Sequence, residues 1–173
     1  MNVSSSHFEL FGLPAAFSID LAALDQAYRR LQAEVHPDRF AAASDAERLQ
    51  SLQMATRVNE AYQTLKNPVS RARYLLQLRG VDTQEESNTA MPVDFLMQQM
   101  VWRESLEEAQ DSITALESLD RELRAAAKNL LATLATSLDA QPNDILATET
   151  VRKLRFIDKV QSEIDQAMEA LEA

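Results

Sequence analysis

Apolar residues in the first 80 positions recur at steps of three and four, which is the period of α-helices. Pro37 ends the first long stripe, because the residue before a proline avoids the α region. The second stripe begins after Ser44-Asp45-Ala46-Glu47, which has the form of a capping box, and stops at Asn67-Pro68. A further helix runs from Pro68 to about Gly80. The first stripe comprises Leu21, Leu24, Tyr28, Leu31 and Val35, and the second comprises Leu49, Leu52, Ala55, Val58, Tyr62 and Leu65.

The second half of the chain predicts three more helices. Residues 81–91 are mostly polar and aperiodic, and we interpret them as a linker. Pro92 opens a helix to about Asp111, and longer helices follow over roughly 116–138 and 148–171. No strand-like alternation of useful length occurs. The pattern therefore predicts an all-α protein, with a small helical domain over 1–80 and an antiparallel three-helix bundle over 92–173.

Composition narrows the chemistry of the chain. It has 173 residues with 2 glycines, no cysteine and 2 histidines, which leaves no phosphate-cradling loop, disulfide, thiol nucleophile or histidine-based metal cluster. We therefore expect no cofactor and no metal. Apolar runs fall far short of the roughly 20 residues of a membrane span. The N-terminus has no signal-peptide pattern, so we expect a cytoplasmic protein.

Charge is distributed unevenly along the chain. Residues 1–80 carry 9 basic and 8 acidic side chains, whereas residues 81–173 carry 8 and 19. The asymmetry suggests two units with different partners. An acidic second half argues against nucleic acid, because phosphate-binding surfaces need an excess of Lys and Arg.

The tripeptide His36-Pro37-Asp38 lies in the connection between the first two long helices. Taken alone, it is typical of a capped turn. A catalytic His/Asp pair would need a nucleophile or an oxyanion-binding loop nearby, and neither is present. We therefore do not expect an enzyme.

The surroundings of this tripeptide have a spaced pattern: Ala27-Tyr28-Arg29-Arg30-Leu31, His36-Pro37-Asp38-Arg39, Asn59-Glu60-Ala61-Tyr62, Pro68 and Arg71-Ala72-Arg73-Tyr74. In order and spacing this pattern resembles a J domain over about residues 7–79. J domains bind DnaK-type ATPase chaperones and stimulate their ATP hydrolysis through the His-Pro-Asp loop and the basic face of the preceding helix. Val35 stands where many J domains have an aromatic residue, and Glu34 reduces the positive charge of the basic face. The chaperone-binding residues that the resemblance implies are Tyr28, Arg29, Arg30, His36, Pro37, Asp38 and Arg39.

The helix over 92–111 carries two apolar stripes on opposite faces. A surface helix of a three-helix bundle buries one broad face. The aromatic stripe is the better core candidate, and the methionine-rich stripe would then face a partner. The alternative is a central helix with both stripes buried. The aromatic stripe comprises Phe95, Trp102, Leu106, Ala109 and, if the helix continues, Ile113; the other comprises Leu96, Met97, Met100 and Val101, followed by Glu104 and Glu108.

Phe156 lies off the apolar stripe of the last helix, between Arg152 and Lys159 on the helical wheel. It is either an aromatic at the core edge or part of a binding surface.

Three further segments extend the pattern over the whole chain: Phe8-Glu9-Leu10-Phe11-Gly12-Leu13-Pro14, Phe95-Leu96-Met97-Gln98-Gln99 and Val151-Arg152-Lys153-Leu154-Arg155-Phe156. With them, the chain resembles the HscB family, J-domain co-chaperones of bacterial iron–sulfur cluster assembly. Members bring the scaffold protein IscU to HscA, a specialised DnaK-type chaperone. Val101 stands where the resemblance implies another acidic residue. The scaffold-binding residues that the resemblance implies are Leu96, Met97, Met100, Val101, Glu104, Glu108 and Phe156.

Two other roles stay open at this stage. One is a general J protein that delivers unfolded clients, although the linker has neither the glycine nor the phenylalanine typical of that class. The other is a purely structural helical protein with a fortuitous His-Pro-Asp. ATPase stimulation of the cognate chaperone would discriminate among the three.

Overall fold

The computed structural model describes residues 5–83 and 91–173, and every regular element in these ranges is helical. The chain divides into an N-terminal unit, Met1–Leu75, and a C-terminal unit, Leu76–Ala173. An all-α fold is thus confirmed. The division falls inside one helix, α4 (Pro68–Leu78). The separation into domains at 80 and 92 stays a prediction, and residues 84–90 of the predicted linker lie outside the described residues.

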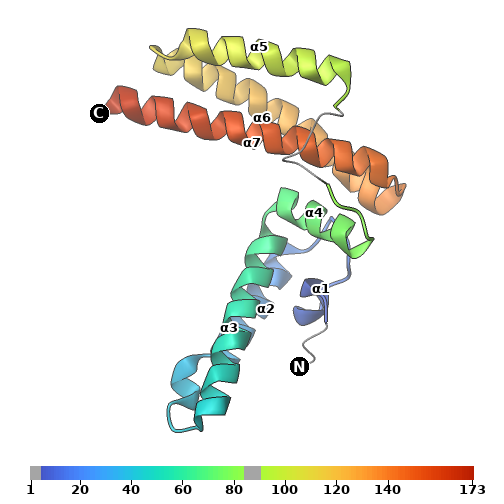
Figure 1. Cartoon of the computed structure of the whole chain (residues 1–173), viewed down its shortest axis with the longest axis vertical. Coiled ribbons are helices and arrows are strands. Elements are labelled where there is room, and N and C mark those ends of the chain that lie inside the picture. The colour runs from blue at the N-terminus through green and yellow to red at the C-terminus, as the bar shows by residue number, and fades with distance from the viewer. Residues whose placement is uncertain (1–4, 84–90) are drawn as a thin grey trace. The chain divides into compact units, whose positions relative to one another are not determined.

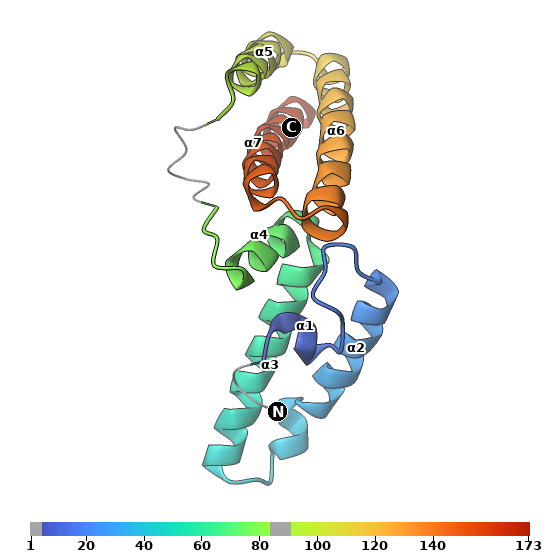
Figure 2. The ribbon, with the colours of Figure 1, turned by 90° about the vertical axis from the view of Figure 1, so that its right-hand side faces the viewer.

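The N-terminal unit is a helical hairpin with a short helix against it. α2 (Leu21–Glu34) and α3 (Asp45–Lys66) run antiparallel, and α1 (His7–Leu10) packs on α3 (Figures 1 and 2). The predicted capping box at Ser44 is confirmed, since its hydroxyl accepts from the Glu47 N–H and the Glu47 carboxylate accepts from the Ser44 N–H. Such a cap contributes about 1 kcal/mol. The fully buried apolar side chains of the N-terminal unit include Phe8, Leu24, Val58, Leu65 and Ala72.

Three leucines assigned to the apolar stripes are exposed instead. Leu21 in the first turn of α2, and Leu49 and Leu52 in the first half of α3, are 49%, 56% and 55% exposed. At 1.5 Å per residue, the 22 residues of α3 extend well beyond the 14 of α2. The start of α3 therefore has no long helix to pack against, and its apolar stripe continues into solvent.

A buried arginine fixes the end of this hairpin. Arg71, 7% exposed, donates to the carbonyl oxygens of Phe17 and Leu65, at 2.6 Å each, and its guanidinium lies 4.9 Å from the Phe17 ring centroid. Arg71 belongs to the sequence pattern that resembles a J domain. In the structure its role is to satisfy backbone carbonyls that would otherwise be buried without donors.

The two glycines of the chain stop helices. Gly12 and Gly80 have φ of 66° and 78°, a region that favours glycine. Each follows a helix whose last carbonyls it satisfies: Gly12 N–H donates to Glu9 O and Gly80 N–H to Gln77 O. The N–H of the next residue also donates to the helix, from Leu13 to Phe8 O and from Val81 to Leu76 O, as in a Schellman motif.

The C-terminal unit is the predicted antiparallel three-helix arrangement. α5 (Val93–Ala109), α6 (Ile113–Ala135) and α7 (Asp144–Glu172) follow one another through short turns (Figures 1 and 2). α6 and α7 form a long hairpin, and α5 contacts both. Residues buried in this core include Trp102, Leu106, Leu116, Leu119, Leu123, Ile157, Val160 and Ile164.

Helix boundaries in this unit differ from the sequence prediction at caps. α6 begins at Ile113 because Ser112 caps it, and α7 begins at Asp144, four residues earlier than predicted, because the Asn143 side chain accepts from the Leu146 N–H. α6 gives way to a single π-helical turn, η2 (Thr136–Ala140), before Pro142. α5 ends at Ala109, so Ile113 does not extend its aromatic stripe and is 37% exposed.

Candidate functional site

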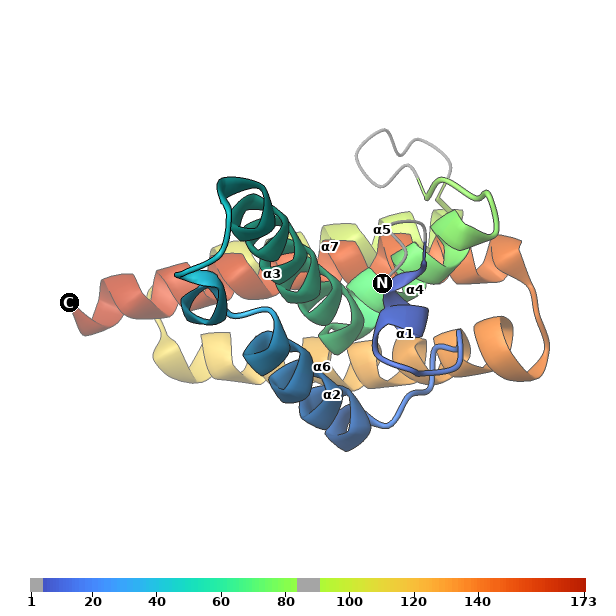
Figure 3. The same cartoon turned by 90° about the horizontal axis from the view of Figure 1, so that it is seen from below.

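The His-Pro-Asp loop, residues 36–38, lies at the end of the α2–α3 hairpin (Figures 1 and 3). Pro37–Phe40 form a 3₁₀ turn, η1, with Pro37 at its first position, and a capped turn is what the tripeptide alone indicated. A proline there fixes φ and costs no hydrogen bond. The loop therefore presents its side chains from a stiff turn.

His36 caps this turn with its own side chain. Its Nδ1 accepts from the Asp38 N–H at 3.2 Å, and the Arg39 N–H donates to the His36 carbonyl at 3.0 Å. An accepting Nδ1 places the ring proton on Nε2 in the neutral tautomer. The 3.5 Å approach of Nδ1 to the Asp38 carboxylate is an ion pair only when the ring is protonated. The side chains of His36 and Asp38 are 53% and 92% exposed, so both are open to a partner.

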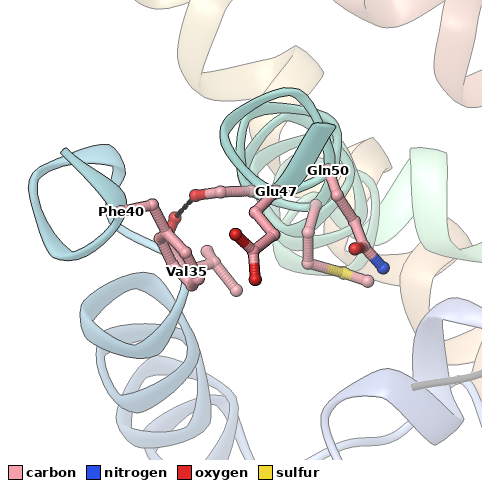
Figure 4. A pocket seen from close by; sticks show the side chains of 6 residues that line it. Val35, Phe40, Glu47 and Gln50 are labelled. Carbon is pink, nitrogen blue, oxygen red and sulfur yellow. Dashed lines mark hydrogen bonds between the residues drawn. The ribbon is translucent and has the colours of Figure 1, made fainter. Parts of the chain in front are cut away.

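The base of the loop is anchored by a buried hydroxyl. Ser51, 5% exposed, donates to the Val35 carbonyl at 2.8 Å and so ties α3 to the end of α2. Figure 4 shows this bond beside a pocket of about 300 Å³, which Val35 and Phe40 line on one side and Glu47 and Gln50 on the other. Hydrogen bonds from the backbone and hydroxyl of Ser44 lower the pKa of Glu47, and both bonds reach its Oε2.

The predicted chaperone-binding residues of α2 and η1 differ in exposure. Arg29, Arg30 and Arg39 are exposed. Tyr28 is different, because its ring stacks on Tyr62 with centroids 3.9 Å apart and its hydroxyl donates to Asn59 at 2.8 Å. Tyr28 thus joins α2 to α3, and its contact with a partner stays a prediction.

The outer face of α5 is exposed, as one of the two alternatives required. Side chains of the aromatic stripe, Phe95, Trp102, Leu106 and Ala109, are each at most 7% exposed. The outer face comprises Leu96, Met97, Met100 and Val101, which are 42%, 63%, 64% and 52% exposed, and the exposed Glu104 and Glu108.

Part of this face borders a pocket of about 470 Å³, which we name the α5 groove. It is lined by Leu96, Gln99, Met100, Arg103, Glu104 and Phe156. The groove therefore unites four of the predicted scaffold-binding residues across 60 positions of sequence. Met97 and Val101 lie on the same helix outside it, and Glu108 lines a separate pocket near the turn between α5 and α6.

Phe156 is both a core-edge aromatic and a groove residue. Its ring meets Phe95 edge-on at 6.0 Å and stacks on Trp102 at 6.3 Å between centroids. The Arg103 guanidinium lies 5.3 Å from the same centroid and is ion-paired with Glu163. The aromatic cluster and this cation hold the Phe156 ring in place at the groove.

Gln99 and Arg103 are groove residues that the sequence interpretation missed. They are polar and lie between the two apolar stripes of α5, so periodicity assigned them to neither. The available signal was spacing, because both lie three residues after a predicted site residue, Leu96 or Met100.

Neither surface has the ligands of a metal centre. No group of three or more His, Asp or Glu side chains suited to a metal ion occurs in 5–83 or 91–173. Within the same ranges, no helix combines the length and the apolar character that crossing a membrane requires.

Two family models match the chain, one in each unit. The DnaJ domain matches residues 6–74, and the HSCB C-terminal oligomerisation domain matches residues 91–165. A co-chaperone protein HscB homolog of Chromobacterium violaceum is 57% identical over 164 residues, 95% of this chain and 94% of the relative. A homolog of the same name in Paraburkholderia xenovorans is 53% identical over 173 residues, 99% of this chain and 98% of the relative.

Solved structures agree with these matches. Chaperone HscB from Vibrio cholerae superposes with a TM-score of 0.85 at 40% identity, covering 96% of this chain and 99% of the other. The crystal structure of human co-chaperone protein HscB gives a TM-score of 0.92 at 31% identity, over 96% and 83% of the two chains.

Proposed function

Because this chain belongs to the HscB family of J-domain co-chaperones, we propose that it delivers the iron–sulfur scaffold protein IscU to the DnaK-type chaperone HscA and stimulates ATP hydrolysis by HscA. A J-domain co-chaperone implies a DnaK-type partner and a substrate protein, and a non-enzymatic role. We propose HscA as the DnaK-type partner and IscU as the substrate protein, each with its own binding surface.

The observation that carries the proposal is the pair of exposed surfaces, one in each unit. The His-Pro-Asp loop is polar and stiff, whereas the α5 groove is apolar with a carboxylate and a guanidinium at its margin. Two surfaces of such different chemistry suit two different partners, as an adaptor requires.

HscA is assigned to the loop. His36 and Asp38 offer hydrogen-bonding groups from a turn that Pro37 stiffens, and Arg29, Arg30 and Arg39 add positive charge that steers the unit to an acidic surface. Tyr28 supports this surface by joining α2 to α3 through its contacts with Tyr62 and Asn59. Binding one conformation of the ATPase in preference to another shifts its conformational balance toward hydrolysis.

IscU is assigned to the outer face of α5 and Phe156. Its binding segment would place an apolar side chain in the α5 groove against Leu96, Met100 and Phe156, with Met97 and Val101 extending the contact. The carboxylates of Glu104 and Glu108 would meet polar or basic groups at the rim of that contact.

The test is a reconstitution of HscA ATPase activity with and without IscU. Asp38→Asn should remove stimulation in both conditions, whereas Asp45→Asn, at an exposed carboxylate on α3, should retain it. The double variant Leu96→Ala/Met100→Ala should stimulate HscA alone as the parent does but lose the added effect of IscU. Its matched control is Ile145→Ala/Leu146→Ala, which removes exposed apolar area at the start of α7.

Full stimulation by a folded Asp38→Asn protein would disprove the assignment of HscA to the loop. Normal IscU binding by the folded α5 variant would place the scaffold surface elsewhere.

A further inference from the structure

Methionine exposure is concentrated on the outer face of α5. Met97 and Met100 are 63% and 64% exposed, whereas Met91 is 8% exposed. The two other methionines of the described residues, Met54 and Met168, are half-buried. The chain has no cysteine, so methionine supplies its only oxidisable sulfur.

We propose that Met97 and Met100 are sites of reversible oxidation by hydroperoxides, and that their sulfoxides weaken binding of the scaffold protein. The second half of this inference rests on the proposed function. The first half concerns the chain alone, and the two can be tested separately.

The reaction is an oxygen transfer from the peroxide to sulfur. The thioether sulfur attacks one peroxide oxygen, the O–O bond breaks and an S–O bond forms. With hydrogen peroxide, the proton of the transferred oxygen moves to the departing hydroxide, which leaves as water. Sulfur is oxidised to the sulfoxide and the peroxide is reduced, so one peroxide is consumed for each methionine. Methionine sulfoxide reductases reduce the sulfoxide back to methionine.

The position of the two side chains determines the consequence. They lie one turn apart and point away from the core, so a sulfoxide oxygen remains hydrated in the free protein and leaves the fold intact. A bound partner would cover it. Met100 shares the α5 groove with Leu96 and Phe156, and the Arg103 guanidinium at the groove is already paired with Glu163. Gln99 is the other groove residue with N–H donors, and the Glu104 carboxylate there can only accept. A covered sulfoxide oxygen would therefore lose its hydrating water beside few donors, and would place a polar atom against the apolar contacts of the partner.

Two measurements test the inference. Peptide mass mapping of the full chain during limited treatment with hydrogen peroxide should find Met97 and Met100 oxidised before Met54, Met91 and Met168. Titration of the treated protein with IscU should then show affinity reduced by roughly tenfold or more. Incubation with methionine sulfoxide reductases should restore the affinity.

Two variants assign the effect to these sulfur atoms. In Met97→Leu/Met100→Leu the treated and untreated proteins should bind IscU equally, whatever that affinity is, because leucine does not react. Met168→Leu, on α7 of the same unit, should remain as sensitive to peroxide as the parent chain.

Each remaining outcome overturns a defined part of the inference. Earlier oxidation of a buried methionine would remove the proposed site. Equal binding by oxidised and untreated parent protein would remove the effect on the partner while leaving the proposed function in place. Failure of the untreated parent to bind IscU would overturn the proposed function together with that effect, and the order of oxidation would still stand on its own.

Discussion

The His-Pro-Asp loop and the outer face of α5 are both exposed, but the fold supports them differently. The loop is held by its own turn: His36 caps η1, and the Ser51 hydroxyl ties its base to α3. The α5 face lies on the reverse of a helix whose other side supplies Phe95, Trp102 and Leu106 to the core. Phe156 belongs to both the core edge and the groove.

This difference predicts how separable function and folding are in the two units. Side chains of the loop can change without disturbing any buried contact. Substitutions within one turn of α5 can affect only the exposed face or can remove core contacts. Phe156 on α7 combines both, because it lies at the core edge and at the groove.

The largest expected effect is on the buried side of α5. Trp102→Ala should lower the free energy of unfolding of the C-terminal unit by about 3–5 kcal/mol, because it removes a buried indole that also donates to Glu122. Met97→Ala should change it by about 0.5 kcal/mol or less. Urea unfolding followed by far-UV circular dichroism measures both, and comparable losses would show that the two faces of α5 are not distinct.

Phe156→Ala should combine both kinds of loss. We expect about 1–3 kcal/mol less stability, since the ring is only half-buried, and weaker IscU binding. Phe156→Leu keeps an apolar side chain at the groove but removes the ring that contacts Phe95, Trp102 and Arg103. If Phe156→Ala binds normally in calorimetric titration, the aromatic serves the core alone.

Charge reversal of Arg29 and Arg30 should leave stability unchanged and slow association with HscA by roughly tenfold at low salt. Screening should shrink the difference as salt increases. Reversal of Arg121 and Lys128, exposed on α6, changes net charge by the same amount and serves as the control. Equal slowing by both double variants in stopped-flow measurements would attribute the effect to net charge alone.

The smallest expected effect is a pH dependence of the N-terminal unit. Burial, reinforced by Arg57, lowers the pKa of His7 below 6.5, although Glu60 acts in the opposite direction. The unfolded chain therefore binds this proton more readily than the folded one. The contribution of neutral His7 to the stability of the folded unit is fully present above pH 6.5, and it is lost as pH falls through the lowered pKa. Its Nδ1 is buried without a partner, and its ring stacks on Tyr74 at 4.3 Å.

His7→Phe keeps a ring against Tyr74 and removes the titration. Thermal unfolding between pH 7.5 and 5.5 should show a decline in the parent protein that is smaller in this variant. The two proteins differ at this one side chain, so the difference between their pH profiles reports His7. An identical decline would assign the pH dependence to other groups.

Hydrophobic periodicity predicted the helices and the correct inner face of α5, because both follow from a period of 3.6 residues and one broad buried surface. It failed where burial depends on the length of a neighbour, as at Leu49 and Leu52. It also missed a helix start set by a single capping side chain, Asn143. The α5 groove could not be derived from periodicity, since its shape arises where two helices distant in sequence meet. Only the family resemblance joined Phe156 to Leu96.

The backbone at the two glycines that end helices favours a D-residue over an L-residue. Gly12 and Gly80 have left-handed φ values, and a Cβ added at either position would meet no atom within 4 Å. Only the handedness of the backbone therefore opposes a side chain there. A D-alanine introduced by chemical ligation favours this φ and restricts the unfolded chain, so it should stabilise each stop by about 0.4–1 kcal/mol, whereas L-alanine should destabilise it. The chain thus has two positions at which the mirror-image residue is the better fit.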